Sequence, residues 1–281
     1  MRPFFIEFRM FAKMSNMQIG IIGSGSWATA IAKIITDNGN EINWWVRQSE
    51  NITYFNKRHH NPHYLRNAFF DTTKINFSDD IAEVVKQSTV IIMAVPSIHI
   101  ESVLQAVPLD LLKDKKVVSA IKGVMPKYNI LLHEFLAQKF DFPIQQYFTL
   151  LGPSHAEEVA AEQLSYLTFS GVDTLLTNEI ASYFKCDYIN TIVNNDVVGV
   201  QYAGVLKNIY ALGAGIAHGL EYGDNFLSVY IANCANEMAN FLQKCDHPEG
   251  ASKTSVAPNY NASVYLGDLL VTCYSLYSRN R

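Results

Sequence analysis

Residues 17–30 read MQIGIIGSGSWATA, a sequence that predicts a β-strand, a glycine-rich turn and an α-helix in immediate succession. The apolar residues that lead into the turn are rich in isoleucine, and apolar residues at helical spacing follow it. Gly23, Gly25 and Ala28 form the pattern G-x-G-x-x-A at the junction. In this context the pattern is typical of a turn that binds the pyrophosphate of a dinucleotide, although a sharp turn without a ligand would look similar.

Each of the three positions has its own physical role in such a turn. Gly23 allows the chain to turn tightly, Gly25 lets the backbone approach a pyrophosphate, and Ala28 lets the helix pack closely against the strand. The first amide groups of the helix would offer hydrogen bonds and a partial positive charge to the phosphates. The sequence therefore predicts a dinucleotide-binding site at this turn.

Strand and helix patterns alternate along the next part of the chain. Short apolar runs predict strands at residues 41–46, 89–95, 117–121, 147–151 and 166–170, with a crossover helix at 97–107. After Asp196, a predicted N-cap, strand patterns fade and residues 197–212 and 225–243 predict long helices. We therefore expect an α/β fold, in which a Rossmann-like doubly wound domain at residues 17–195 precedes an all-α domain at residues 196–281.

Composition excludes several classes of protein. The 281 residues carry a net charge of −4 without a dense basic run, so nucleic acid is not an expected partner. Four widely spaced cysteines predict neither a metal site nor a disulfide framework, and reduced thiols indicate a cytoplasmic protein. The apolar stretch 197–217 contains Lys207 and other polar residues, so no integral membrane segment is expected. Residues 1–16 lack the apolar core of a signal peptide, and we expect a disordered extension outside the domain.

Arg47 follows the second predicted strand. In dinucleotide-binding folds, residues at this position distinguish the ribose of NAD from that of NADP. Sites that prefer NAD usually place Asp or Glu near this position, whereas an arginine accommodates the 2′-phosphate of NADP. Glu50 lies three residues further along the chain. The sequence predicts that NADP(H) is accepted, with a solvated arginine at a strand end as the alternative.

Lys207 is the only charged residue between residues 197 and 217. A helix with so few charges has no obvious solvent-exposed face. Its lysine must therefore be paired, extend its side chain to solvent, or titrate at a lowered pKa. Asp268 is the only acidic residue after Glu249, and it also lies in an apolar stretch. These two residues could form an ion pair. The alternatives are that Lys207 snorkels to solvent and that Asp268 only caps the helix that follows it.

Three further segments carry weaker signals. Lys122 follows a predicted strand, and ligands of open α/β sheets bind at the carboxyl ends of strands. The turns at 152–154 and 278–280 are rich in groups that suit an anion. The histidines at 59–63 lie in a polar loop rather than at metal-ligand spacing, so no metal is predicted.

Taken in order, these segments resemble the bacterial NAD(P)-dependent glycerol-3-phosphate dehydrogenase family, and the resemblance extends over residues 17–281. It is carried by GSGSWATA (23–30), WVR (45–47), AVPS (94–97), IKG (121–123), GPSHAEE (152–158), GVLKN (204–208), HGLEYGDN (218–225) and LGDLLVTCYSLYSRN (266–280). Members of this family continue beyond the last motif. The resemblance therefore implies that the helical domain is incomplete at its C-terminus.

The resemblance also implies a role for each matching residue. The cofactor contacts would be Gly23, Gly25, Ser26, Trp27, Arg47, Lys122, Ala156 and Arg279. The substrate contacts would be Lys122, Gly152, Ser154, Lys207, Asp268, Thr272, Ser278, Arg279 and Asn280. Lys207 would be the catalytic proton donor and acceptor, with Lys122 and Asp268 as the other catalytic residues.

The implied activity is the reversible reduction of dihydroxyacetone phosphate to sn-glycerol 3-phosphate with NAD or NADP as cofactor, which supplies glycerophospholipid synthesis. The partner would be a small phosphorylated substrate, and a homodimer is among the expected forms. The alternatives are a related dehydrogenase for a hydroxyacyl or hydroxy-acid substrate, and a truncated, inactive dinucleotide-binding remnant. The combination of Lys207, Asp268 and Arg279 disfavours a purely structural module.

Overall fold

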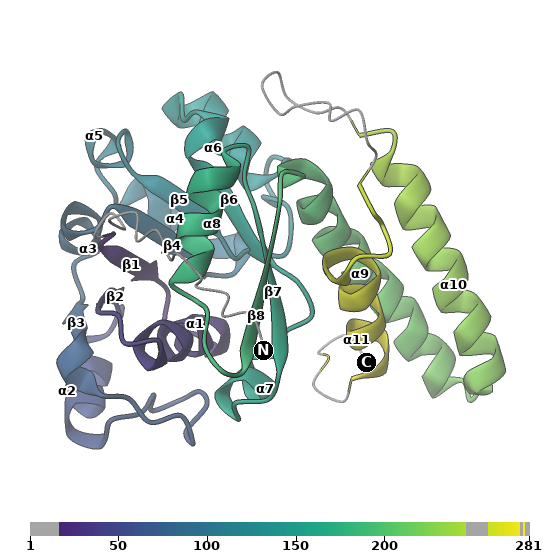
Figure 1. Ribbon diagram of the computed structural model, residues 1–281, viewed down its shortest axis with the longest axis horizontal. Coiled ribbons are helices and arrows are strands. Elements are labelled where there is room, and N and C mark those ends of the chain that lie inside the picture. Colours follow the sequence, from purple (N-terminus) through teal and green to yellow (C-terminus); the bar gives the residue numbers. More distant parts are fainter. Residues whose placement is uncertain (1–16, 246–257, 276–277, 279–281) are drawn as a thin grey trace, which may run out of the picture.

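The computed structural model describes residues 17–245, 258–275 and 278. An eight-stranded sheet forms the larger part, and a group of helices stands beside it (Figure 1). The strands are β1 (Ile19–Ile22), β2 (Ile42–Trp45), β3 (Ile75–Ser78), β4 (Val90–Met93), β5 (Lys116–Ser119), β6 (Tyr147–Leu151), β7 (Ser165–Ser170) and β8 (Ile189–Asn194). The helices are α1 (Ser26–Asp37), α2 (Ser49–Arg58), α3 (Ile81–Gln87), α4 (Ile100–Gln105), α5 (Leu109–Leu112), α6 (Leu132–Phe140), α7 (Ala156–Ala160), α8 (Thr174–Ser182), α9 (Val197–Gly219), α10 (Gly223–Leu242) and α11 (Asp268–Tyr274). The extension predicted at residues 1–16 lies outside the described residues.

The strand order confirms the expected Rossmann-like, doubly wound α/β fold. The sheet runs β3-β2-β1-β4-β5-β6-β7-β8, and the direction of winding reverses between β1 and β4. Neighbouring strands pair in parallel, except that β6 and β7 pair antiparallel. In sheets of this order, ligands bind outside the carboxyl ends of the strands at the point of reversal.

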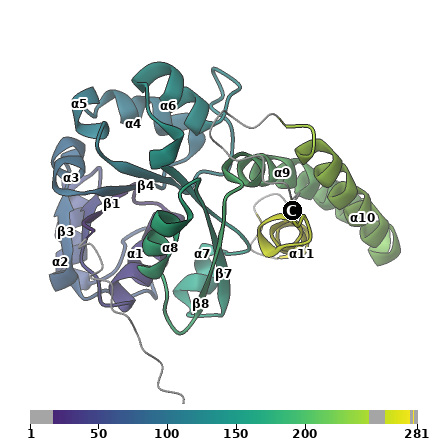
Figure 2. The same cartoon turned by 45° about the horizontal axis from the view of Figure 1, so that its top comes forward.

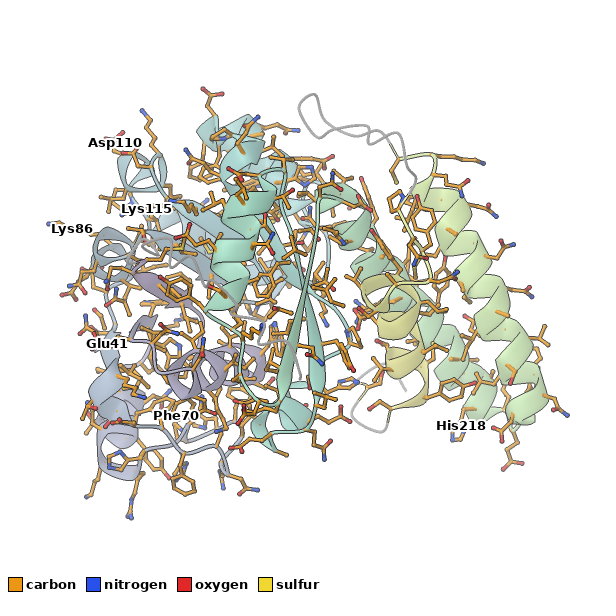
Figure 3. All side chains as sticks on the ribbon, viewed as in Figure 1. Glu41, Phe70, Lys86, Asp110, Lys115 and His218 are labelled. Atoms are coloured by element: carbon orange, nitrogen blue, oxygen red, sulfur yellow. The ribbon has the colours of Figure 1, made fainter. Side chains whose placement is uncertain are left out.

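Successive residues of the central strand β1 supply two cores, one on each face of the sheet. Ile21 packs in the core that includes α1, α7 and α8, whereas Ile22 packs in the core that includes α3, α4 and α6. Figure 2 shows α4 and α6 on one side of the sheet and α1, α7 and α8 on the other. Exposed charged residues such as Lys86 and Asp110 lie at the outer surface (Figure 3).

All six predicted strands are present, and two further strands, β3 and β8, were not predicted. Both missed strands lie at edges of the sheet. Only the first of the four residues of β3 is buried, and β8 mixes buried with exposed positions. Neither strand therefore shows the continuous apolar run of a central parallel strand. The predicted crossover at 97–107 contains a short 3₁₀ turn followed by α4.

The helices after the sheet begin with a capped N-terminus. The Asp196 carboxylate accepts a hydrogen bond from the Gly199 amide at 2.8 Å, which confirms the predicted N-cap of α9. The helix runs seven residues beyond the predicted end, and α10 returns antiparallel beside it (Figure 1). Helix α11 packs against α9.

Among the described residues, no helix combines the length and the apolar character that a bilayer crossing needs. We propose a division into domains at residues 195 and 196, between the last strand and α9.

Candidate active site

A cleft of about 570 Å³ opens at the carboxyl ends of β1, β4 and β5, where α9 and α11 approach the sheet. Its position matches the reversal of strand order between β1 and β4. Nine of the predicted site residues line it: Gly25, Ser26, Trp27, Lys122, Ser154, Ala156, Lys207, Thr272 and Ser278. The fold therefore brings the glycine turn, near the start of the chain, to one cleft with residues of the last helices.

The glycine turn has the shape that a pyrophosphate requires. At Gly23 φ is +124°, and a Cβ atom there would lie 2.5 Å from the Ala94 carbonyl oxygen, so only glycine fits. At Gly25 φ is −76°, and a Cβ atom would meet nothing within 4 Å. The chain itself does not need a glycine at position 25. The open space above this backbone, at the start of α1, therefore fits the pyrophosphate of a dinucleotide.

The two glycines should respond differently to alanine. We expect Gly25→Ala to leave the melting temperature unchanged and to weaken NADPH binding by about tenfold, because its methyl group occupies the ligand's space. We expect Gly23→Ala to lower the melting temperature, because its methyl group meets the Ala94 carbonyl. Thermal unfolding and calorimetric titration with NADPH measure both effects. Unchanged NADPH affinity in Gly25→Ala would contradict this placement of the cofactor.

Lys207 lies at the centre of a buried cluster of polar side chains. Its ammonium group lies 2.6 Å from the Asp268 carboxylate and donates a hydrogen bond of 3.1 Å to the Thr272 hydroxyl. The Thr272 hydroxyl in turn donates to the Asp268 carbonyl oxygen at 2.6 Å. Lys207 and Asp268 are 4% and 2% exposed, so neither reaches bulk solvent. The structure thus pairs the two residues, rather than leaving Lys207 as a snorkelling side chain.

The surroundings of Lys207 favour the loss of its proton. Burial, and then the positive charge of Lys122, lower its pKa to about 8, although the Asp268 carboxylate acts in the opposite direction. The desolvation effect is larger because the helix around this lysine carries no other charged residue. A lysine with such a pKa can donate a proton as the ammonium form and accept one as the neutral amine near neutral pH.

Lys122 connects this cluster with the glycine turn. Its ammonium group lies 3.8 Å from the second Asp268 oxygen and 6.0 Å from the centroid of the Trp27 ring. Trp27 belongs to the first turn of α1. Two lysines therefore share one carboxylate, and this excess of positive charge suits an anionic ligand.

The segment 152–156 contributes Ser154 and Ala156 to the lining of the cleft. At Gly152 φ is +118°, and a Cβ atom there would lie 2.9 Å from the Tyr166 carbonyl oxygen. Ser154 is buried, and its hydroxyl donates to the Gly152 carbonyl at 3.1 Å. His155 lines the cleft, and its pKa is lowered by burial and by the nearby charge of Lys122. A neutral imidazole therefore lies beside the two lysines.

Arg47 lies in a separate pocket of about 250 Å³ beyond the end of β2. Ser24, Asn51 and His63 also line this pocket, and Tyr64 lines both this pocket and the main cleft. The two cavities are therefore neighbours on either side of the glycine turn. A dinucleotide that crossed the turn would place its adenosine end beside Arg47.

Some predicted residues are not part of the described structure, and some cleft residues were not predicted. Arg279 and Asn280 lie outside the described residues, so their predicted roles stay predictions. The polar residues that line the cleft without having been predicted are Tyr64, Ser97, His155, Glu157 and Asn208. Most of them lie within motifs that the sequence analysis quoted, so their membership of these motifs could have identified them as site residues. Among the described residues, no group of three or more His, Cys, Asp or Glu side chains could hold a metal ion.

Comparison with protein families matches both parts of the chain. Residues 18–175 match the family described as NAD-dependent glycerol-3-phosphate dehydrogenase N-terminus. Residues 196–281 match the family described as NAD-dependent glycerol-3-phosphate dehydrogenase C-terminus. The first match ends within α8, and the second begins at the N-cap of α9.

Individual proteins show the same similarity over nearly the whole chain. The glycerol-3-phosphate dehydrogenase [NAD(P)+] of Bacillus subtilis is 35% identical over 265 residues, which cover 94% of this chain and 74% of that protein. The enzyme of the same name from Lacticaseibacillus casei is 32% identical over 270 residues, covering 94% and 75%. The crystal structure of glycerol-3-phosphate dehydrogenase from Coxiella burnetii superposes with a TM-score of 0.80 at 26% identity, covering 94% and 78%. The chain therefore belongs to the NAD(P)-dependent glycerol-3-phosphate dehydrogenase family.

Proposed function

We propose that this protein reduces the ketone of dihydroxyacetone phosphate to sn-glycerol 3-phosphate with NADH or NADPH, in a reversible reaction that supplies glycerophospholipid synthesis. The observation that carries the proposal is the Lys207–Asp268–Thr272 cluster, of which Lys207 and Thr272 line the same cleft as the glycine turn. The nicotinamide cofactor supplies the hydride, which leaves the protein to bind, orient and protonate the substrate.

Lys207 is the proposed proton donor. As hydride reaches the carbonyl carbon, negative charge develops on the carbonyl oxygen, and the ammonium group stabilises this charge and transfers its proton. The Asp268 carboxylate orients Lys207 through the 2.6 Å contact. Lys122 adds a second positive charge at the border between cofactor and substrate. The reverse reaction uses neutral Lys207 to accept the proton of the alcohol.

The remaining residues hold the substrate away from the reacting carbon. Gly152, Ser154, Thr272 and Ser278 would contact glycerol 3-phosphate in this proposal. Arg279 and Asn280 would bind its phosphate, as the family resemblance implies. Such remote contacts orient the ketone and lower the entropic cost of reaction.

The direct test follows NADH and NADPH oxidation with dihydroxyacetone phosphate, and separately with a ketoacyl and a keto-acid compound, which are the oxidised forms of hydroxyacyl and hydroxy-acid substrates. The proposal predicts turnover with the phosphorylated ketone and little with the others. Faster turnover of another substrate would assign the site to a related dehydrogenase. Cofactor binding without any turnover would instead indicate an inactive dinucleotide-binding protein.

The pH dependence of the two directions should be opposite. Ketone reduction needs protonated Lys207, whose pKa is lowered to about 8. We therefore expect kcat for reduction to fall as pH rises through about 8, and kcat for oxidation of glycerol 3-phosphate to rise over the same range. Initial rates at saturating substrate from pH 6 to 10 measure this. The same trend in both directions would argue against Lys207 as the acid and base.

Arg47 should decide how well NADPH competes with NADH. We expect Arg47→Ala to raise KM for NADPH by about tenfold and to leave KM for NADH nearly unchanged, because only NADPH carries a 2′-phosphate. Arg66 is a matched control, since it is also exposed and lies in the neighbouring loop without lining the pocket. Equal losses for both cofactors would show that Arg47 does not recognise the 2′-phosphate.

A further inference from the structure

Buried side chains hold three successive carbonyl oxygens of the glycine turn. The Trp44 indole donates to the Gly23 carbonyl at 2.6 Å, and the Asn61 amide donates to the Ser24 carbonyl at 3.1 Å. The Thr29 hydroxyl donates to the carbonyl of Gly25 at 2.8 Å. Each of the three donors comes from a different segment of the chain. The turn is thus held from β2, from the loop after α2 and from α1.

Asn61 makes more side-chain hydrogen bonds than the other two donors. It is 2% exposed, and its amide nitrogen donates to the Thr29 hydroxyl at 2.8 Å as well as to the Ser24 carbonyl. Its amide oxygen accepts the backbone N–H groups of His63 and Tyr64 at 2.9 and 3.1 Å. This one side chain therefore joins two segments, with its nitrogen on the glycine turn and its oxygen on the turn at residues 61–64.

Both of these segments border the space that a dinucleotide would occupy. Tyr64 lines the main cleft and also the pocket of Arg47, and Ser24 lines the latter. Asn61 reaches the Gly25 carbonyl indirectly, because Thr29 receives a hydrogen bond from Asn61 and donates one to Gly25. The distance between the two walls is thus set by a buried amide, and Asn61 also forms part of the lining of the Arg47 pocket.

We propose that Asn61 is a positioning residue for the dinucleotide, which fixes the Tyr64 turn against the glycine turn before the ligand binds. The proposal rests on the proposed use of NAD(P)H but not on the identity of the ketone substrate. Walls that are already held in place lose little conformational freedom on binding. Without Asn61, the ligand would have to order both turns, and its affinity would fall while the proton-transfer cluster at Lys207 stayed intact.

The test compares Asn61→Ala with Asn43→Ala in the full chain. Asn43 is a matched control because it is 8% exposed, donates to the Gln87 carbonyl and the Ser88 hydroxyl, and accepts from the Asn76 amide, without lining either pocket. We expect Asn61→Ala to raise the Kd for NADPH, and KM for NADPH, by about tenfold, which corresponds to about 1.4 kcal/mol. The value of kcat at saturating NADPH should stay close to wild type, and Asn43→Ala should leave Kd unchanged.

Calorimetric titration with NADPH alone measures Kd without turnover, so the role of Asn61 in NADPH binding can be tested even if the protein is catalytically inactive. An unchanged Kd in Asn61→Ala, or an equal increase in both variants, would overturn the proposal. Should Asn61→Ala fail to fold, Thr29→Val decides, since it keeps the side-chain volume and removes the hydroxyl between Asn61 and the Gly25 carbonyl. A raised Kd in Thr29→Val supports the proposal, and an unchanged Kd overturns it.

Discussion

Replacing Lys207 by methionine should lower kcat for dihydroxyacetone phosphate reduction by about three orders of magnitude. Methionine keeps the length and packing of the side chain but can neither donate a proton nor stabilise negative charge on the carbonyl oxygen. The Asp268 carboxylate would retain Lys122 as its partner, at 3.8 Å. Because the glycine turn and the Arg47 pocket are unaltered, we expect NADPH to bind nearly as well as in the wild type.

Lys33 provides the matched control for this substitution. It is also a buried lysine, paired with Asp37 at 2.7 Å and with Glu162 at 3.0 Å, but it does not line the cleft. We expect Lys33→Met to lower the melting temperature while turnover of the folded protein persists. If both variants lost the same share of kcat, loss of stability rather than of the proton donor would explain the result for Lys207.

Asp268→Asn should have the second largest effect, with kcat for reduction falling by about a hundredfold. The substitution is isosteric, but it leaves the ammonium groups of Lys207 and Lys122 close together without their shared carboxylate. The carboxylate supports the charged form of Lys207 against burial. Without it the pKa of Lys207 should fall further, so the pH at which reduction is half lost should move below that of the wild type.

Asp196→Asn tests whether this shift is specific. Asp196 is likewise buried, and its carboxylate accepts hydrogen bonds from the Tyr265 hydroxyl and the Gly199 amide at the start of α9. Its loss should lower the melting temperature of the protein without moving the midpoint of the pH–rate profile. A wild-type midpoint in Asp268→Asn would show that Asp268 does not control the protonation of Lys207.

Local sequence patterns were sufficient for the central strands and for the start of α9. Central parallel strands are buried on both faces, so they appear as continuous apolar runs that are visible without knowledge of their neighbours. The cap at Asp196 depends on contacts within three residues, so it is equally visible. The edge strands β3 and β8 and the antiparallel pairing of β7 depend on which strand lies next to them, and this is a property of the whole sheet.

The proton-transfer cluster was predictable in part from local sequence, and in part it depends on tertiary packing. A charged residue in an apolar helix must find a partner, so Lys207 and Asp268 could be identified from the sequence as unusual residues and candidate partners. The contact itself is a tertiary one, as is the hydrogen bond between Lys207 and Thr272, 65 positions apart. The approach of Lys122 to the same carboxylate depends on how α11 packs against α9, which no local pattern records.

By itself the sequence determined the strand–turn–helix unit at residues 17–30, the class of fold, and the residue types able to carry the chemistry. Only the tertiary structure decided that Tyr64 borders both cavities and that Asn61 joins the Tyr64 turn to the glycine turn. The physical reason is the range of the interactions. Periodicity, capping and turn geometry act over a few residues, whereas a cleft is made of surfaces from distant segments, whose positions are set by the packing of the sheet and helices together.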